Sequence, residues 1–257
     1  MTAVTTERRE HILLITINRP EARNAVNGAV AAGMEEAIDE LETEQSIWCA
    51  ILSGAGPAFC AGADLKEIAS GNGASLSTPR GGFAGIVWRE RAKPLIAAVD
   101  GPALAGGTEI VLSCDLIVAS RAASFGLPEV KRSLVAAAGG AFRLPRILPR
   151  AIAMEALLTG EPISAETAYQ HGMINHLVEP GQATVGAMEL AETICKNAPL
   201  AVSETYKIAR QSFFGSVPES DLFRASRDAM NRLAETNDYK EGPLAFIEKR
   251  QPRWSGS

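Results

Sequence analysis

Along roughly the first 145 residues, short apolar runs alternate with segments of helical character, and this alternation restricts the fold to the α/β class. The runs are rich in β-branched and aliphatic residues, which is typical of strands that are buried on both faces. They occupy residues 11–18, 47–53, 94–99 and 114–119. Residues 29–44 are rich in alanine and glutamate and predict an amphipathic helix between the first two runs.

After about residue 145 the strand pattern nearly disappears and the sequence predicts helices. The expected helices span residues 151–159, 165–170, 183–197, 199–212 and 218–235. The chain length of 257 residues fits one large domain or a domain with a small appendage. We therefore predict an α/β core over residues 1–195, followed by a helical C-terminal region over residues 196–257.

One segment breaks the alternation of strand and helix. Residues 70–82 are dominated by glycine, serine, threonine and proline, a composition typical of a mobile loop. Long loops in compact domains are often lids or binding loops, and we expect such a role here.

Composition excludes several classes of function. A net charge of -5 argues against nucleic acid as the main partner. No apolar run reaches the length of a membrane span, and residues 1–10 are polar, so we expect a cytoplasmic protein without a membrane segment. The cysteines show no spacing typical of metal ligands, and we expect reduced thiols and no metal. They are Cys49, Cys60, Cys114 and Cys195.

Two glycine-containing turns each connect a predicted strand to a predicted helix. The first spans residues 59–65 and the second spans residues 105–109. Small residues leave the backbone N–H groups of such turns accessible, and the helix N-terminus adds a partial positive charge. One N–H group from each turn could point at the same oxygen and stabilise negative charge there.

Two glutamates stand in mainly apolar sequence surroundings. Glu109 ends the second turn and precedes Ile110, while Glu129 follows residues 125–128 and precedes Val130. Burial makes ionisation of a carboxyl group costly. Taken singly, Glu109 could favour a helix N-terminus and Glu129 could be an ordinary turn residue. Together with both glycine turns, they predict an acid/base pair acting on one substrate or water molecule.

This combination resembles the enoyl-CoA hydratase/isomerase (crotonase) family along nearly the whole chain. The similar stretches are residues 18–26, 59–65, 93–101, 106–115, 125–129, 139–146 and 241–250. The resemblance implies the crotonase (ClpP-like) fold of repeated β-β-α units, with a helical C-terminal region that contributes to trimerisation and CoA contact. It also implies a homo-oligomer, either a trimer or a dimer of trimers.

The resemblance assigns roles to individual residues. It places the N–H groups of Ala63 and Gly106 at the carbonyl oxygen of an acyl-CoA thioester. It places Phe246 and Lys249 at the CoA of a neighbouring subunit. The remaining CoA-binding positions that it implies are Arg23, Ala61, Gly62, Asp64, Leu65 and Lys66.

The hydratases of the family are similar to this chain in having glutamate at both catalytic positions. The implied reaction is syn addition of water to a trans-2-enoyl-CoA thioester, without a cofactor because CoA is part of the substrate. Glu109 would take the proton of water and Glu129 would protonate the α-carbon; which carboxyl starts with a proton stays open. The alternatives are a carnitinyl-type dehydratase, an enoyl-CoA isomerase and a non-catalytic, possibly RNA-associated, binding member.

Residues 133–140 depart from the family pattern, because a proline is missing and small residues replace bulkier ones. The resemblance places these positions beside the acyl pocket, so we predict a widened pocket for a branched or bulky acyl group. The test of this widened pocket is to compare the turnover of crotonyl-CoA with that of bulky enoyl-CoA esters on the same preparation. A strong preference for the short straight chain would contradict the prediction.

Overall fold

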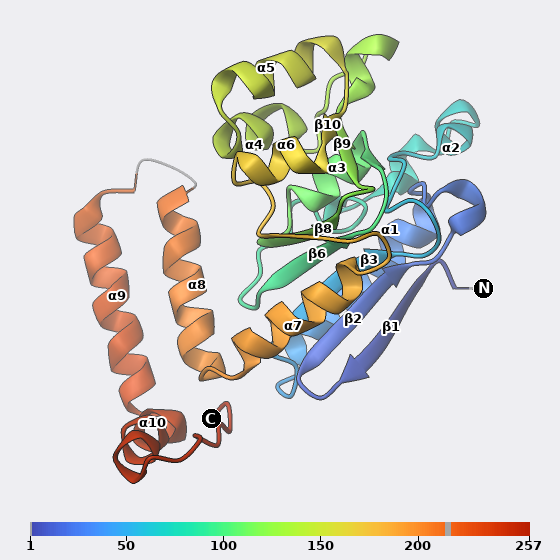
Figure 1. Cartoon of the computed structure of the whole chain (residues 1–257). Helices are drawn as coiled ribbons and strands as arrows, with labels where there is room; N and C mark the ends of the chain where they lie inside the picture. Colours follow the sequence, from blue (N-terminus) through green and yellow to red (C-terminus); the bar gives the residue numbers. More distant parts are fainter. Residues whose placement is uncertain (1, 214–216) are drawn as a thin grey trace.

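The apolar runs form the centre of a six-stranded sheet in the computed structural model, which describes residues 2–213 and 217–257 (Figure 1). The strand order is β1-β2-β3-β6-β8-β11. Strand β1 is antiparallel to β2, and the other neighbours are parallel. The bounds are β1 (Val4–Arg9), β2 (Ile12–Ile17), β3 (Cys49–Gly54), β6 (Leu95–Val99), β8 (Leu116–Ser120) and β11 (His176–Val178).

The central strands are parallel and almost wholly buried, as their continuous apolar sequence predicts. The two edge strands, β1 and β11, were not predicted. Strand β1 is largely exposed and carries threonine, glutamate and arginine side chains, which suit an unpaired sheet edge but give no apolar signal.

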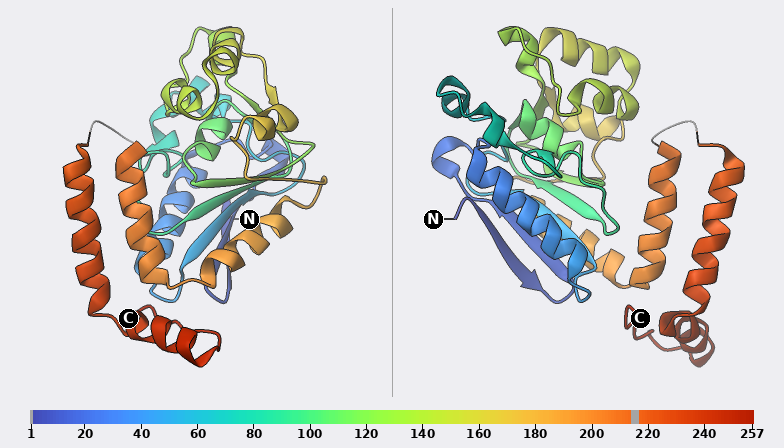
Figure 2. Two further views of the ribbon diagram at one scale, coloured as in Figure 1. Left: turned by 60° about the vertical axis from the view of Figure 1, so that its left-hand side comes forward. Right: turned by 180° about the vertical axis from the view of Figure 1, so that it is seen from behind.

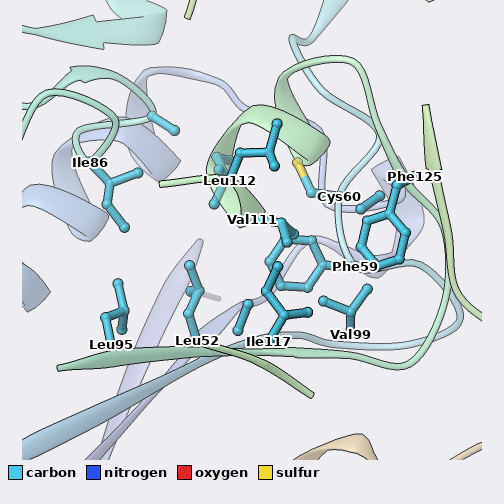
Figure 3. Packing of buried hydrophobic residues seen from close by; sticks show 14 of the residues in the cluster. Leu52, Phe59, Cys60, Ile86, Leu95, Val99, Val111, Leu112, Ile117 and Phe125 are labelled. Carbon is cyan, nitrogen blue, oxygen red and sulfur yellow. The ribbon is translucent and has the colours of Figure 1, made fainter. Parts of the chain in front are cut away.

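Helices cover both faces of this sheet (Figure 2). Helix α1 (Gly28–Thr43) lies on one face, where Asn27 caps it by accepting the N–H of Val30 at 3.0 Å. Helix α7 (Ala183–Cys195) lies on the other face and presents alanines four residues apart to the strands. Small side chains at this spacing allow close packing of the helix on the sheet. The larger of the two apolar clusters includes Phe59 and Phe125 (Figure 3).

A second, three-stranded sheet carries the loops around the site. Its order is β10-β9-β7, with β9 (Ser124–Gly126) parallel to β7 (Ala103–Leu104) and antiparallel to β10 (Ile163–Ser164). Helix α3 (Gly106–Val111) begins directly after β7. The 3-10 helix η3 (Pro128–Arg132) begins shortly after β9. Because β7 and β9 are paired in parallel, the N-terminal ends of α3 and η3 lie at the same edge of this sheet.

The segment predicted as a mobile loop contains secondary structure. Residues 73–76 form the 3-10 helix η2, and β4 (Ser77–Thr78) pairs with β5 (Gly82–Phe83). Thr78 donates a hydrogen bond to Glu35 at 2.7 Å, and Arg80 pairs with Asp39 at 2.6 Å. These acidic partners lie on α1, more than forty positions earlier, so local composition gave no sign of them.

The last helices extend away from the sheets. Helices α8 (Pro199–Phe213) and α9 (Glu219–Ala234) lie side by side, and α10 (Asn237–Glu248) follows at the end remote from α2 (Leu65–Ala69) (Figures 1 and 2). They fall in the predicted region 196–257, of which residues 214–216 lie outside the described part; the division at residue 195 stays a prediction. Helices α5 (Arg150–Thr159) and α6 (Ala165–Gln170) match their predicted ranges, whereas α4 (Gly140–Ile147) and α10 were not predicted.

In the described part of the chain, the helices are all too short or too polar to cross a membrane.

Asn24 joins the loop before α1 to the turn after β3. Its side chain is fully buried, accepts the N–H of Arg19 at 2.9 Å, and donates to the carbonyls of Ala55 and Ala58 at 2.8 and 2.7 Å. Its backbone is left-handed, with a φ of 56°, a conformation that asparagine tolerates better than most residues. Asn24 thus fixes the chain that leads into residues 59–65.

We expect Asn24→Ala to lower the free energy of unfolding by about 3 kcal/mol, because it leaves buried carbonyl and N–H groups without partners. Chemical denaturation measures the change. Asn72→Ala, at an exposed position, is the matched control and should cost about 0.5 kcal/mol or less. Equal effects of the two substitutions would contradict the assigned role of Asn24.

Candidate active site

The two glycine turns predicted from the sequence touch each other. Gly62 has a φ of +92°, and a Cβ atom added to it would lie 2.8 Å from the Cβ of Ala105 and 3.0 Å from the nitrogen of Gly106. The N–H of Leu104 donates to the carbonyl of Cys60 at 2.9 Å, so a backbone hydrogen bond also joins the two turns. Only glycine permits this approach at position 62, because any side chain would collide with the second turn.

The N–H groups of Ala63 and Gly106 are available to a ligand. Gly106 is the first residue of α3, whose initial N–H groups have no partner within the helix. Ala105 turns the chain into this helix with a φ of 52°. Within residues 2–213 and 217–257, neither N–H group donates to a protein acceptor. Both residues border the same cavity.

This cavity has a volume of about 500 Å³ and lies between the two turns, η3 and the segment that follows it. The predicted site residues that line it are Ala61, Ala63, Leu65, Gly106, Glu109 and Glu129. Most of the remaining lining is apolar. It includes Ile68, Phe83, Trp88, Leu104, Leu134, Val135, Ala137 and Ala138.

Four of the predicted CoA-binding residues do not line the cavity and instead make contacts within the protein. They are Arg23, Gly62, Asp64 and Lys66. The carbonyl of Arg23 accepts the N–H of Ala61 at 3.0 Å, and Gly62 packs on the second turn. The Asp64 carboxylate caps α2 by accepting the N–H of Lys66 at 3.1 Å, and it pairs with Arg19 at 3.1 Å. Their contact with CoA stays a prediction.

Phe246 and Lys249 lie at the end of α10, far from α2 in the same chain (Figures 1 and 2). Phe246 is 85% exposed, and Lys249 adopts a left-handed conformation at the helix end. Neither residue lines the cavity. Their contact with the CoA of a neighbouring subunit stays a prediction.

Glu109 is buried on α3, with an exposed fraction of 4%. Its Oε1 accepts the backbone N–H of Gly140 at 2.9 Å. Burial raises the pKa of this carboxyl to about 7; the hydrogen bond from Gly140 opposes the rise, and the charge of Glu129 adds to it. A carboxyl group with this pKa exchanges protons readily at neutral pH.

Glu129 faces the same cavity from η3. Its Oε2 atom is buried and has no hydrogen-bond partner among the described residues. Burial raises the pKa of Glu129, while a backbone hydrogen bond of its own residue and the charge of Arg132 lower it. A buried carboxyl oxygen without a protein partner is suited to exchange a proton with a bound molecule.

Two further residues of the cavity lining, Phe83 and Arg132, are not among the site residues predicted from the sequence. Arg132 belongs to a basic sequence segment that is typical of a solvated face, and it is exposed while also lining the cavity. The signal that could have found it is its position three residues after Glu129, on the same short helix. Trp88 also lines the cavity and packs on Gly82.

The cavity is therefore bordered by two residues with available N–H groups and by two carboxyls of raised pKa. Such donors stabilise a carbonyl oxygen that gains negative charge, and such carboxyls move protons at neighbouring carbon atoms. The described residues include no group of three or more histidine, cysteine, aspartate or glutamate side chains that could hold a metal ion. The fold and site define an acid/base enzyme that acts on a carbonyl compound.

Comparison with known proteins identifies the family. The sequence pattern of the enoyl-CoA hydratase/isomerase family matches residues 7–257, and the chain belongs to this family. A relative named enoyl-CoA hydratase EchA19, from Mycobacterium tuberculosis, is 42% identical, with 96% of this chain and 94% of the relative covered. A carnitinyl-CoA dehydratase from Salmonella arizonae is 40% identical, with 97% of each chain covered.

The fold is shared with solved structures of the family. The crystal structure of an enoyl-CoA hydratase from Mycobacterium tuberculosis superposes with a TM-score of 0.95 at 48% identity, over 100% of both chains. These comparisons confirm the predicted family, the crotonase fold and the predicted class of enzyme, an enoyl-CoA hydratase.

The raised pKa of Glu109 makes stability depend on pH. Between its ordinary value of 4.5 and about 7, the folded chain holds a proton that the unfolded chain has released. The free energy of unfolding therefore falls as pH rises through this window, by at most about 3 kcal/mol. We expect Glu109→Gln, whose amide oxygen still accepts from Gly140, to stabilise the protein more at pH 8 than at pH 5.

Denaturant unfolding of both proteins across this pH range is the measurement, with the exposed Glu155→Gln on α5 as control. A constant difference between the parent and Glu109→Gln would show that Glu109 keeps one charge state throughout.

Proposed function

We propose that the cavity adds water to the double bond of a trans-2-enoyl-CoA thioester, with the roles that follow. The thioester carbonyl accepts the N–H groups of Ala63 and Gly106, which stabilise the enolate-like oxygen. Glu109 takes a proton from water while the water oxygen bonds to the β-carbon. Glu129 gives its proton to the α-carbon. The observation that carries the proposal is that both carboxyls line one cavity with both N–H donors.

The electrostatics support a pair of carboxyls in different protonation states. Hydration needs one carboxylate and one protonated carboxyl at the same time, and mutual repulsion in a poorly solvated cavity favours this state. The charge of Glu129 is among the causes that raise the pKa of Glu109. The two groups are thus coupled, so the protonation state of one affects that of the other.

A dehydratase of the carnitinyl type is the second candidate function, supported by the relatives of that name. Its chemistry is related, because removal of water from a 3-hydroxyacyl thioester uses the same two carboxyls in reverse. The apolar lining by Leu134, Val135, Ala137 and Ala138 supports an uncharged acyl group instead. An isomerase would need no water, and a second acid/base carboxyl favours hydration over it.

A homo-oligomer, with CoA held partly by Phe246 and Lys249 of a neighbouring subunit, belongs to this proposal. Large apolar side chains are exposed on the C-terminal helices, including Phe223 at 73% and Ile247 at 74%. Such exposure suits burial against another copy of the chain. We also place the enzyme in the cytoplasm, acting without a metal or redox cofactor.

We expect Glu109→Gln and Glu129→Gln each to lower kcat for crotonyl-CoA hydration by about 10²–10⁴-fold, because each removes one proton transfer. Binding of the CoA ester should persist, since the N–H donors are unchanged. Loss of the enoyl absorbance measures turnover, and calorimetric titration with a saturated acyl-CoA measures binding. Glu155→Gln is the control, and full activity in either active-site variant would refute the acid/base assignment.

A further inference from the structure

Thr108, the residue before Glu109, has a buried hydroxyl group that the proposed reaction does not use. The residue is 1% exposed. Its Oγ1 lies 2.7 Å from the carbonyl oxygen of Ala103, 2.9 Å from that of Gly126 and 3.0 Å from the nitrogen of Gly126. A hydroxyl has one hydrogen to donate and two lone pairs that accept, so these contacts must divide between the two roles.

The surroundings indicate how they divide. The carbonyl of Gly126 already accepts the N–H of Ala105 at 2.8 Å. The nitrogen of Gly126 can only donate, so the Thr108 hydroxyl accepts from it. Its single hydrogen is donated toward the carbonyls of Ala103 and Gly126, of which Ala103 is the nearer. Pairing of β7 with β9 ends at Leu104 and Gly126, where Ala105 turns the chain into α3. The hydroxyl supplies an acceptor to β9 just where β7 stops.

This contact links the two glutamates through a short path. Glu109 follows Thr108 directly, and Glu129 lies three residues after Gly126. Between them, Leu127 is 1% exposed and Pro128 has a restricted φ. The carboxyls come from separate elements, α3 and η3, and the Thr108 hydroxyl joins the chain segments that carry them.

We propose that Thr108 is a positioning residue, whose hydroxyl sets the separation of Glu109 and Glu129 so that both reach one water molecule. The inference rests on the proposed hydratase function. Proton transfer at two sites of one substrate tolerates little error, and a displacement of about 1 Å can cost about 10²-fold in rate. Loss of the hydroxyl removes the contact between Thr108 on α3 and the Gly126 peptide groups of β9, and frees β9 to move relative to α3.

A purely structural hydroxyl would have a different signature. Its removal would lower the unfolding temperature but leave kcat and its pH dependence unchanged in the folded enzyme. A positioning hydroxyl changes kcat while KM stays close to that of the parent, because the thioester donors do not depend on the separation of the carboxyls.

Thr108→Ser and Thr108→Ala form a matched pair that differs only in the hydroxyl. We expect the serine variant to keep kcat near that of the parent. The alanine variant should lose about 10- to 100-fold in kcat for crotonyl-CoA, with little change in KM. The basic limb of its pH–kcat profile should move to lower pH, because the second carboxyl then ionises against a weaker repulsion from the first.

Thr108→Val, which keeps the volume of the side chain, repeats the test if the alanine variant does not fold. Ile110→Val, a buried change on the same helix, controls for general loosening of α3. Parent-like kcat and pH profile in folded alanine or valine variants would overturn the inference, as would equal losses in the serine and alanine variants. Full activity in Glu109→Gln or Glu129→Gln would instead overturn the proposed function, whatever Thr108 does.

Discussion

The contact between the two glycine turns is the constraint on which the site depends. Gly62 approaches Ala105 and Gly106 so closely that no side chain fits between them. The contact has a backbone cost, because Ala105 adopts a left-handed φ of 52°. Buried hydrogen bonds of Asn24 and Thr108 hold the segments on either side of the contact. This arrangement directs two N–H groups from distant parts of the sequence into one cavity.

The same burial that stabilises the core creates the chemistry. Glu109 belongs to a helix whose described side chains are all buried, and an ionised carboxyl there is costly. The N–H of Gly140 offsets part of this cost, and the remainder appears as a raised pKa. Glu129, less buried and beside Arg132, stays more accessible to solvent and to substrate. The pair thus differs in environment although the residue type is the same.

The sequence predicted the central strands, most helices and the two glutamates that line one cavity, because periodicity and glycine turns are local signals. It failed for β1, whose polar edge-strand sequence resembles a loop, and for residues 73–83, whose partners lie on α1. Arg132 is exposed, as its basic neighbourhood predicts, and it also lines the cavity, which the sequence did not indicate. In each case the deciding contact is made by residues far apart in the sequence.

By itself, the sequence determined the α/β class, the family and the residue types of the site. Composition, alternation and short motifs are properties of neighbouring residues, so they can be read without coordinates. The tertiary structure decided that Glu109 and Glu129 share one cavity and that Asp64 supports α2 instead of lining that cavity. It also decided that Thr108 spans from α3 to β9. These depend on how separate elements pack, which sequence spacing does not encode.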